Sequence, residues 1–267
     1  MSVILKKNGE LQYFQAEGIS ASHCFTTRLG GVSKGFLSSM NIGTSRGDDR
    51  ENVLENYRIL GNALGFVPEN LVLSRQVHSD IVRVVDRSHR GAGLFTDHLP
   101  DCDALITNEK GLALVIFTAD CTPVLFWDPV TGAVGGAHAG WRGTALAIAA
   151  RTVEAMEKNF GTKPENLRCA IGPNIGPCHF ETNADVPQAM LAAFGEQARP
   201  YIRENGEKFH VDLKGLNAMI LRNAGVSHIE ISDACTACRQ DLFWSHRLVG
   251  QQRGSEGAVI VCGEGCL

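Results

Sequence analysis

Apolar residues recur with helical spacing in four parts of the chain. Residues 51–66 are the clearest case, because positions 53, 54, 57, 60 and 64 are apolar or aromatic and Gly65 is suited to end a helix. The same spacing predicts a helix over 144–160. Two later segments, 183–194 and 213–225, have similar patterns and predict two further helices.

Short apolar runs predict the strands. Residues 71–85 are β-rich and can form one strand broken near its middle, or two strands. Two buried strands are predicted with the TADCTP segment as the turn between them, and a glycine-weakened strand follows. The remaining strand enters a loop rich in Gly and Pro, and two more precede the C-terminus. In order, these segments are 112–117, 124–128, 132–138, 168–181, 228–234 and 257–262.

The predicted strands and helices follow one another along the chain, and the sequence has no internal repeat, no low-complexity run and no linker. We therefore predict one α+β domain over residues 1–267, with mixed β-sheets and flanking helices. The chain has no G-x-G-x-x-G motif after its first strand and no Walker A motif. A dinucleotide site or a P-loop nucleotide site therefore has no support in the sequence.

Composition and charge narrow the class of protein further. The chain has 267 residues, of which 44% are hydrophobic and 20% charged, and its formal net charge is −4. This charge argues against nonspecific binding of nucleic acid, which needs a basic surface. No apolar run approaches the roughly 18 residues of a membrane span, and the N-terminus lacks signal-peptide features. We expect a soluble cytoplasmic protein, whose nine cysteines are mostly free thiols.

Three residues occupy similar settings at or near the ends of β-rich segments, beside small or turn residues. They are His78, Cys121 and His138. Two imidazoles and a thiolate suit a borderline-soft metal such as Zn²⁺, and three protein ligands leave a fourth position for water or substrate. The three residues are too far apart in the chain to form a short ligand motif. From the pattern alone, ordinary core positions are the alternative.

Nine short motifs, in order over nearly the whole chain, resemble the family long described as multicopper polyphenol oxidases or laccases. That family is now regarded as containing zinc-dependent purine nucleoside phosphorylases. Its fold is compared with that of cysteine hydrolases. The motifs are FTTRLGGVSKG (25–35), MNIG (40–43), QVHS (76–79), DALIT (103–107), ADCTPVLFWDP (119–129), AHAGWRGT (137–144), IGPNIGPCHFE (171–181), ACT (234–236) and FWSHR (243–247).

The resemblance implies a metal held by His78, Cys121 and His138. It also implies phosphorolysis of adenosine, inosine and methylthioadenosine to the free base and ribose 1-phosphate, with adenosine deaminase activity beside it. A true multicopper cluster needs many histidines, largely in His-x-His pairs. This chain has nine histidines and no such pair. Copper is therefore expected only as an alternative to zinc in the single site, with phenol oxidation as a side activity.

Four residues are candidates for binding a nucleoside and phosphate. Arg142 lies at the predicted start of the helix over 144–160, where free N–H groups favour an anion. Asn41 belongs to a family motif, and Arg75 and Gln76 precede His78. Each has a plainer alternative, such as a solvent-facing arginine or a turn asparagine. Trp141 can stack on a purine or belong to the core.

Deamination also requires a group that transfers a proton. The H-x-E motif of cytidine-type zinc deaminases is absent, so another acid must serve. Asp103 and Asp120 are both close in sequence to site motifs, and the sequence does not choose between them.

The cysteines also raise alternatives. Cys121 can be the nucleophile of a hydrolase, with a histidine as its base, an idea linked to peptidoglycan-precursor editing. A ligand pocket without catalysis is a third alternative.

The other cysteines offer a second possible metal site. A second, structural zinc site can be formed by Cys235, Cys238, Cys262 and Cys266, or these residues can simply be free thiols. Cys178 and His179 are predicted to line the pocket, with side chains that diverge along an extended chain. The sequence does not fix the oligomeric state.

Overall fold

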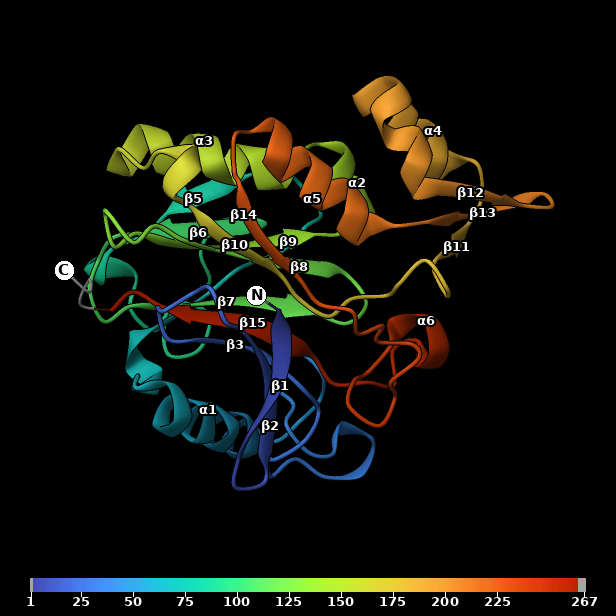
Figure 1. The fold of residues 1–267 in the computed structure, drawn as a ribbon. Helices are drawn as coiled ribbons and strands as arrows, with labels where there is room; N and C mark the ends of the chain where they lie inside the picture. Colours follow the sequence, from blue (N-terminus) through green and yellow to red (C-terminus); the bar gives the residue numbers. More distant parts are fainter. Residues whose placement is uncertain (1, 264–267) are drawn as a thin grey trace.

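Two six-stranded β-sheets lie face to face in a computed structural model that describes residues 2–263 (Figure 1). The first sheet has the order β1-β2-β3-β15-β7-β4 and the second has the order β14-β10-β8-β9-β6-β5. The strands of the first sheet are β1 (Val3–Asn8), β2 (Leu11–Ala16), β3 (His23–Thr26), β15 (Glu256–Val261), β7 (Ala113–Thr118) and β4 (Leu71–Leu73). Those of the second are β14 (His228–Ile231), β10 (Arg168–Ile171), β8 (Thr122–Trp127), β9 (Val134–Ala139), β6 (Ala104–Thr107) and β5 (Val82–Val84).

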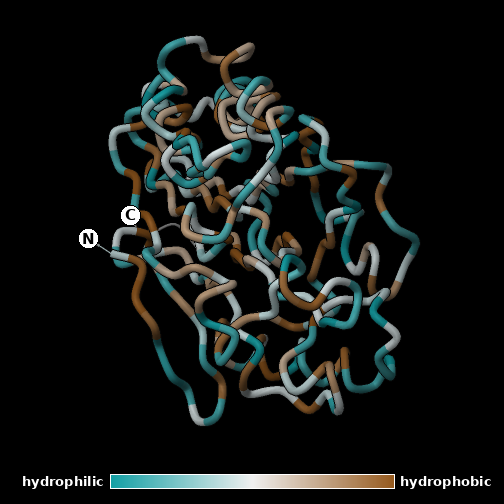
Figure 2. Tube along the Cα trace, turned by 90° about the vertical axis from the view of Figure 1, so that its right-hand side faces the viewer, coloured by the Kyte–Doolittle hydropathy of each residue, from teal (hydrophilic) through white to brown (hydrophobic). Residues whose placement is uncertain are grey.

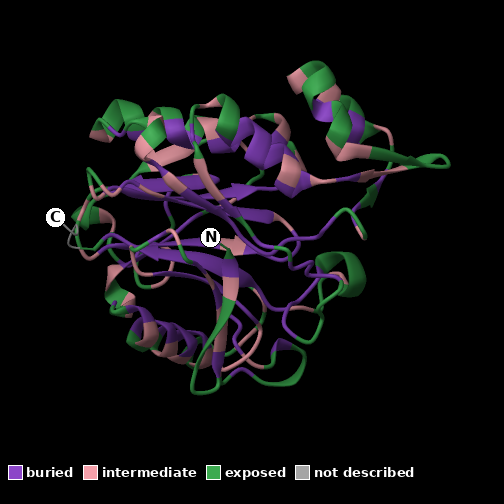
Figure 3. Ribbon diagram, viewed as in Figure 1, coloured by how far each residue is buried: buried purple, intermediate pink, exposed green. Residues whose placement is uncertain are grey.

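Helices cover the outer face of each sheet, which gives a four-layer arrangement of helix, sheet, sheet and helix (Figure 1). Helix α1 (Arg50–Leu64) packs on the first sheet. Helices α3 (Ile148–Phe160) and α5 (Leu213–Asn223) pack on the second. The central strands of the two large sheets and the inward helix faces are buried, whereas the outward helix faces are exposed (Figure 3).

Smaller elements complete the fold around one end of the sandwich. A third, three-stranded sheet and α4 lie beside the second sheet, and the short helices α2 and α6 lie at the same end (Figure 1). These elements are β11 (Glu181–Thr182), β13 (Lys208–Val211), β12 (Ile202–Asn205), α4 (Asp185–Phe194), α2 (Trp141–Ala145) and α6 (His246–Val249). The 3₁₀ helices span Gly35–Leu37, Pro68–Asn70, Arg87–His89, Pro164–Asn166 and Gly195–Tyr201.

The continuous apolar runs are explained by burial on both faces of a strand. In β7, Ala113 and Val115 face helix α1, whereas Leu114 and Ile116 face the second sheet. Successive side chains of a strand point to opposite faces, so both sets must be apolar. The α+β class with mixed sheets, predicted from the sequence, is confirmed.

Close packing of the two sheets explains the glycines of β9. A Cβ atom on Gly136 would lie 2.8 Å from a side-chain carbon of Ile116 in the facing sheet. Such a distance is shorter than van der Waals contact, so a larger residue would push the sheets apart. The glycine-rich segment predicted as a strand over 132–138 therefore forms β9, and its glycines allow β9 to pack closely against the first sheet.

The segment 71–85 forms two strands that belong to different sheets. Strand β4 pairs with β7 in the first sheet, and β5 pairs with β6 in the second. The TADCTP segment likewise connects β7 in the first sheet to β8 in the second. Between β1 and β15 the chain passes from one sheet to the other four times. Two of these passages, β4 to β5 and β7 to β8, carry His78 and Cys121.

The predicted helices are found with one correction. Helix α1 ends at Leu64 with Gly65 in the left-handed region, as expected. The single helix predicted over 144–160 is wrong, because the chain breaks after α2 and resumes as α3. The break places Ala147 at φ 59° and leaves Leu146 48% exposed instead of buried on the helix face.

Polar segments predominate along the outer loops of the chain trace (Figure 2). Within residues 2–263, no helix is both long enough and apolar enough to cross a membrane.

Candidate functional site

The site forms where the two crossover segments meet the end of β9. His78 lies between β4 and β5, and Cys121 lies between β7 and β8. His138 lies in β9, where it is paired with Pro123 of the neighbouring β8. The pairing of β8 with β9 places His138 beside Cys121, and the passage from β4 to β5 brings His78 to the same edge.

The three predicted metal ligands converge in the structure. Their ligand atoms all lie within 4.8 Å of one another. The Sγ of Cys121 is 3.9 Å from Nε2 of His78, and the two imidazole rings are nearly perpendicular, with centroids 4.7 Å apart. His138 is buried, Cys121 is half-buried and His78 is exposed. Two nitrogens and one sulfur at this spacing fit a zinc or copper ion that stays open on one side.

Asp103 positions His138 and His78 through hydrogen bonds. Its carboxylate is fully buried and accepts a 2.8 Å hydrogen bond from Nδ1 of His138, which leaves Nε2 free for a metal. The backbone N–H groups of Val77, His78 and Ser79 also donate to it, at 3.2, 3.0 and 2.6 Å. These bonds hold His78 at φ 62°, a left-handed conformation that is uncommon for a residue with a side chain.

The close approach of these groups shifts their ionisation. Burial alone would raise the pKa of the Cys121 thiol, but the His138 and His78 imidazoles lower the pKa to about 6. Burial would lower the pKa of His138, but Cys121 and Asp103 raise the pKa to about 9. Burial also opposes ionisation of Asp103, whereas hydrogen bonds from His138 and Ser79 lower its pKa. The thiolate favoured here is the form that binds metal.

Gly140 provides the space in which the ligands meet. A Cβ atom at this position would lie 2.9 Å from Cδ2 of His78 and 3.2 Å from Sγ of Cys121. The backbone at Gly140 has φ −61° and ψ 168°, which any residue can adopt. The glycine is therefore needed for the space it leaves, and its conformation does not require it.

We expect Gly140→Ala to weaken metal binding by about tenfold or more, because the added methyl group pushes His78 and Cys121 off their shared geometry. The fold should persist. Metal affinity measured by competition with a chromogenic chelator, together with thermal unfolding, checks this result. Gly263→Ala is the control, since its methyl group meets nothing within 4 Å. Equal affinities in both variants would contradict the steric role.

A cavity of about 540 Å³ opens in front of the three ligands. This volume is within the range of small-molecule sites. Arg46 and Arg253 both line it. Burial and the Arg46 charge both lower the pKa of Arg253. Other lining residues include Gly43, Arg75, Gln76, His98, Phe117, His246, Gln251 and Ser255.

Arg75 and Gln76, the candidate substrate-binding residues from the sequence, both line this cavity, and their binding role stays a prediction. Arg75 is exposed, and its Nε lies 3.2 Å from Asp101 Oδ1. The Gln76 amide pairs with the backbone of Phe117: its Nε2 donates to the carbonyl at 2.8 Å, and its Oε1 accepts from the N–H at 2.7 Å. Arg75 is therefore held by a surface ion pair, and the amide of Gln76 is engaged with the backbone.

Asn41 is completely buried and does not line the cavity. Its Nδ2 donates to Asp48, and its Oδ1 accepts from the N–H groups of Gly43 and Ser255, both at 3.0 Å. The substrate contact expected for Asn41 does not agree with this burial. Its amide instead fixes the loop that leads to Arg46.

Arg142 also lies outside the cavity lining. Its guanidinium group lies 4.2 Å from the centroid of the Trp141 ring, and it is exposed. Helix α2, with five residues, begins at Trp141, one residue before Arg142. The phosphate contact predicted for Arg142 is therefore not supported by its position, and neither is purine stacking on Trp141 at this site.

Asp120 is committed to the structure around Cys121. Its carboxylate accepts hydrogen bonds from Thr236 Oγ1, Ser245 Oγ and Arg247 N, at 2.5, 2.9 and 2.7 Å. Asp103 is similarly occupied. Neither of the two acids considered from the sequence has a free carboxylate oxygen directed into the cavity.

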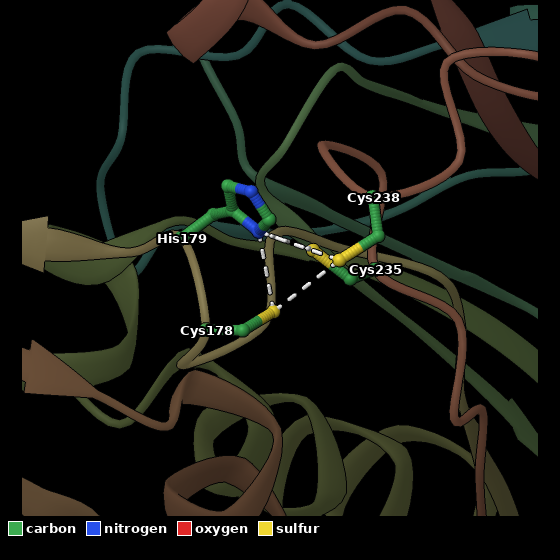
Figure 4. Close-up of side chains that lie close together, drawn as sticks. All are labelled: Cys178, His179, Cys235 and Cys238. Atoms are coloured by element: carbon green, nitrogen blue, oxygen red, sulfur yellow. Dashed lines mark hydrogen bonds between the residues drawn. The ribbon is translucent and has the colours of Figure 1, made fainter.

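The second cluster of cysteines in the structure differs from the predicted set of four. Cys262 is packed in the core, 3.5 Å from the carbonyl of Gly132, and Cys266 lies outside the described residues. The set of Cys235 and Cys238 with Cys262 is therefore wrong. Instead, Cys235 and Cys238 meet Cys178 and His179 (Figure 4). The side chains of this adjacent pair do not diverge, because residues 177–179 form a turn.

Several site residues were not predicted from the sequence. Two of them, Arg46 and Arg253, come from loops, and Phe117 lies near the end of β7. None of these segments carries a local motif. Arg253 approaches the ligands because β15 pairs with β7, which leads directly into Cys121. Only the position of Arg46, shortly after the MNIG motif, gave a signal that could have indicated a role.

Comparisons with known proteins identify the family of the chain. The sequence profile of the family described as "Multi-copper polyphenol oxidoreductase laccase" matches residues 22–263. The chain is 39% identical over 240 residues to "Purine nucleoside phosphorylase YlmD" of Geobacillus stearothermophilus, covering 88% of this chain and 86% of that protein. It is 39% identical over 251 residues to "Purine nucleoside phosphorylase" of Deinococcus radiodurans, covering 94% and 92%. The crystal structure of YlmD from Geobacillus stearothermophilus superposes with a TM-score of 0.92, at 36% identity, covering 98% and 100%.

Proposed function

Because the chain belongs to the multi-copper polyphenol oxidoreductase laccase family, whose compared relatives are named purine nucleoside phosphorylases, we propose that it is a metal-dependent purine nucleoside phosphorylase. The substrates are a purine nucleoside, such as adenosine, inosine or methylthioadenosine, and inorganic phosphate. The observation that carries the proposal is the convergence of His78, Cys121 and His138 at a cavity that also presents two arginines.

The donor set fits a zinc ion. Nε2 of His138 is free because Nδ1 is bonded to Asp103, and the Cys121 sulfur faces Nε2 of His78. A zinc ion held there supplies Lewis acidity to the groups of a bound substrate. Copper can bind the same donors, so phenol oxidation belongs to this proposal as a side activity of the copper-loaded protein.

The residues around the cavity provide the other requirements of phosphorolysis. A phosphate oxygen forms a bond to C1′ of the ribose while the glycosidic C–N bond breaks, and the purine leaves with a proton. Arg46 and Arg253 can hold phosphate through charge-assisted hydrogen bonds, and the Phe117 ring can pack on the purine. His98 and His246 border the same cavity and can donate the proton to the departing base.

Incubation of the metal-quantified protein with adenosine tests the proposal. We expect adenine and ribose 1-phosphate to appear only when phosphate is present, and inosine to appear if the protein also deaminates adenosine. Release of adenine at the same rate without phosphate, with ribose as the product, would indicate a hydrolase. No turnover with adenosine, inosine or methylthioadenosine would contradict the proposal.

We expect Arg46→Ala and Arg253→Ala each to raise the KM for phosphate by about 10–150-fold, because each removes a hydrogen bond between charged groups worth about 1.5–3 kcal/mol. Initial rates at varied phosphate check this prediction. Arg142→Ala is the matched control and should leave this KM unchanged. A raised KM in the Arg142 variant, with normal values in the other two, would show that phosphate binds at α2 and would contradict the role of Arg46 and Arg253.

A cysteine hydrolase is the second candidate, because Cys121, His138 and Asp103 follow one another as in a nucleophile, base and orienting acid. Metal analysis separates the two candidates. Stoichiometric zinc that is required for turnover supports the phosphorylase. Activity that survives removal of the metal and is lost on alkylation by iodoacetamide supports the hydrolase.

A further inference from the structure

A second group of metal-binding side chains lies on two loops outside the cavity. Cys178 and His179 follow β10, whereas Cys235 and Cys238 follow β14 (Figure 4). Cys235 is buried, His179 is half-buried, and Cys178 and Cys238 are exposed. The side chains point toward one another, although the two loops are far apart in the sequence.

The distances between these donors match a tetrahedral zinc site. With Zn–S bonds of about 2.3 Å and Zn–N bonds of about 2.0–2.1 Å, neighbouring ligands lie about 3.8 Å apart for two sulfurs and about 3.6 Å for sulfur and nitrogen. Nδ1 of His179 is 3.3, 3.4 and 3.9 Å from the sulfurs of Cys178, Cys238 and Cys235. The sulfurs of Cys178 and Cys238 are 3.5 Å apart.

Hydrogen bonding within the cluster is insufficient to explain this arrangement. A thiol is a weak donor and a weak acceptor, and one N–H of His179 can serve only one sulfur well. Meanwhile, the backbone N–H of Gly176 donates to Cys235 Sγ at 3.1 Å. Backbone donors of this kind stabilise a metal-bound thiolate.

We propose that Cys178, His179, Cys235 and Cys238 bind a structural zinc ion, separate from the site at His78, Cys121 and His138. Four protein ligands in a Cys₃His set fill the tetrahedron and leave no position for substrate, as in structural zinc sites. The ion joins the loop after β10 to the loop after β14. The proposal is independent of the reaction that the first site catalyses.

The joined loops support the segment that carries Cys121. The N–H of Ile175 donates to the Asp120 carbonyl at 2.9 Å, and Thr236 Oγ1 donates to the Asp120 carboxylate. Asn174 pairs with Cys235 in a parallel bridge between the loops. The second zinc therefore holds together the wall on which Asp120 and Cys121 rest.

The test uses Cys121→Ala as the background, so that the first site no longer binds metal. We expect this variant, purified with zinc present, to retain one zinc per chain by plasma mass spectrometry. Adding Cys238→Ser or His179→Ala should reduce the zinc content severalfold or more and lower the unfolding midpoint. Cys169→Ala and His89→Ala are the matched controls, because each removes the same residue type outside the cluster.

A second measurement uses cobalt(II) as a spectroscopic probe of the cluster. Cobalt(II) added to the metal-free Cys121→Ala protein should give sulfur-to-cobalt charge transfer and intense tetrahedral d–d bands. Loss of both features in the Cys238 variant supports the proposal. The proposal is overturned if Cys121→Ala holds no zinc and gives no such spectrum, if its zinc is unchanged by Cys238→Ser, or if intact mass shows a Cys178–Cys238 disulfide in the purified protein.

Discussion

Replacing Cys121 with alanine is expected to lower kcat/KM for phosphorolysis by about a thousandfold or more and to remove the metal from the first site. Cys121 supplies the sulfur ligand of that site, and its Sγ lies within 4.8 Å of a ring nitrogen of each imidazole. Lewis-acid stabilisation of a transition state is worth several kcal/mol, and about 4 kcal/mol corresponds to a thousandfold in rate. Steady-state kinetics and metal analysis on the same preparation check both effects.

The control for this variant is Cys169→Ala, which removes a fully buried thiol from β10 without touching the cavity. It should keep its metal and its activity. If Cys121→Ala were to lose activity while still holding metal in the first site, then Cys121 would act as a nucleophile and the metal-ligand role would be wrong.

The second large effect is expected for Asp103→Asn. Its carboxylate accepts hydrogen bonds from His138 Nδ1, three backbone N–H groups and the hydroxyl of Ser79. An amide places its NH₂ group against some of these donors, so buried donors lose their partners. We expect a loss of about 3 kcal/mol in the free energy of unfolding and about 10–100-fold weaker metal binding.

Denaturant unfolding of the metal-free protein and metal competition measure these two quantities separately. Asp80→Asn is the control, because Asp80 is half-buried on the same crossover segment. Its one ion pair within residues 2–263, with Arg151, spans 3.9 Å. A surface pair of this kind contributes about 0–1 kcal/mol. If Asp103→Asn bound metal as tightly as the Asp80 variant, Asp103 would not orient His138.

The sequence was sufficient to predict the elements whose pattern is local. The apolar spacing of 51–66 and Gly65 defined helix α1 almost to the residue, because amphipathic periodicity and a left-handed end are both encoded nearby. The strand runs were also found, since burial on both faces leaves a continuous apolar sequence. Strand β1 and the β12–β13 hairpin were not predicted, because their exposed, polar positions interrupt the pattern. Strand β3 is buried throughout but was also not predicted, because its four residues are too few to show a period.

The site depends on relations that the sequence does not express locally. His78 and Cys121 meet because two short connections cross between sheets, and neither connection differs in composition from an ordinary turn. The helix-start argument for Arg142 failed because α2 is short and its arginine stacks on Trp141. The ligand set was identified from the family motifs, and Cys178 with His179 was missed because a tertiary bridge at Asn174 brings their loop to Cys235.

The most direct test of the account is the position of the metal in a crystal of the protein purified with zinc. We expect an anomalous difference peak at the zinc edge that is bonded to Nε2 of His78, Nε2 of His138 and Sγ of Cys121, with its open side toward Arg46 and Arg253. A crystal in which these three side chains converge as described, but without a peak between them, would contradict the account.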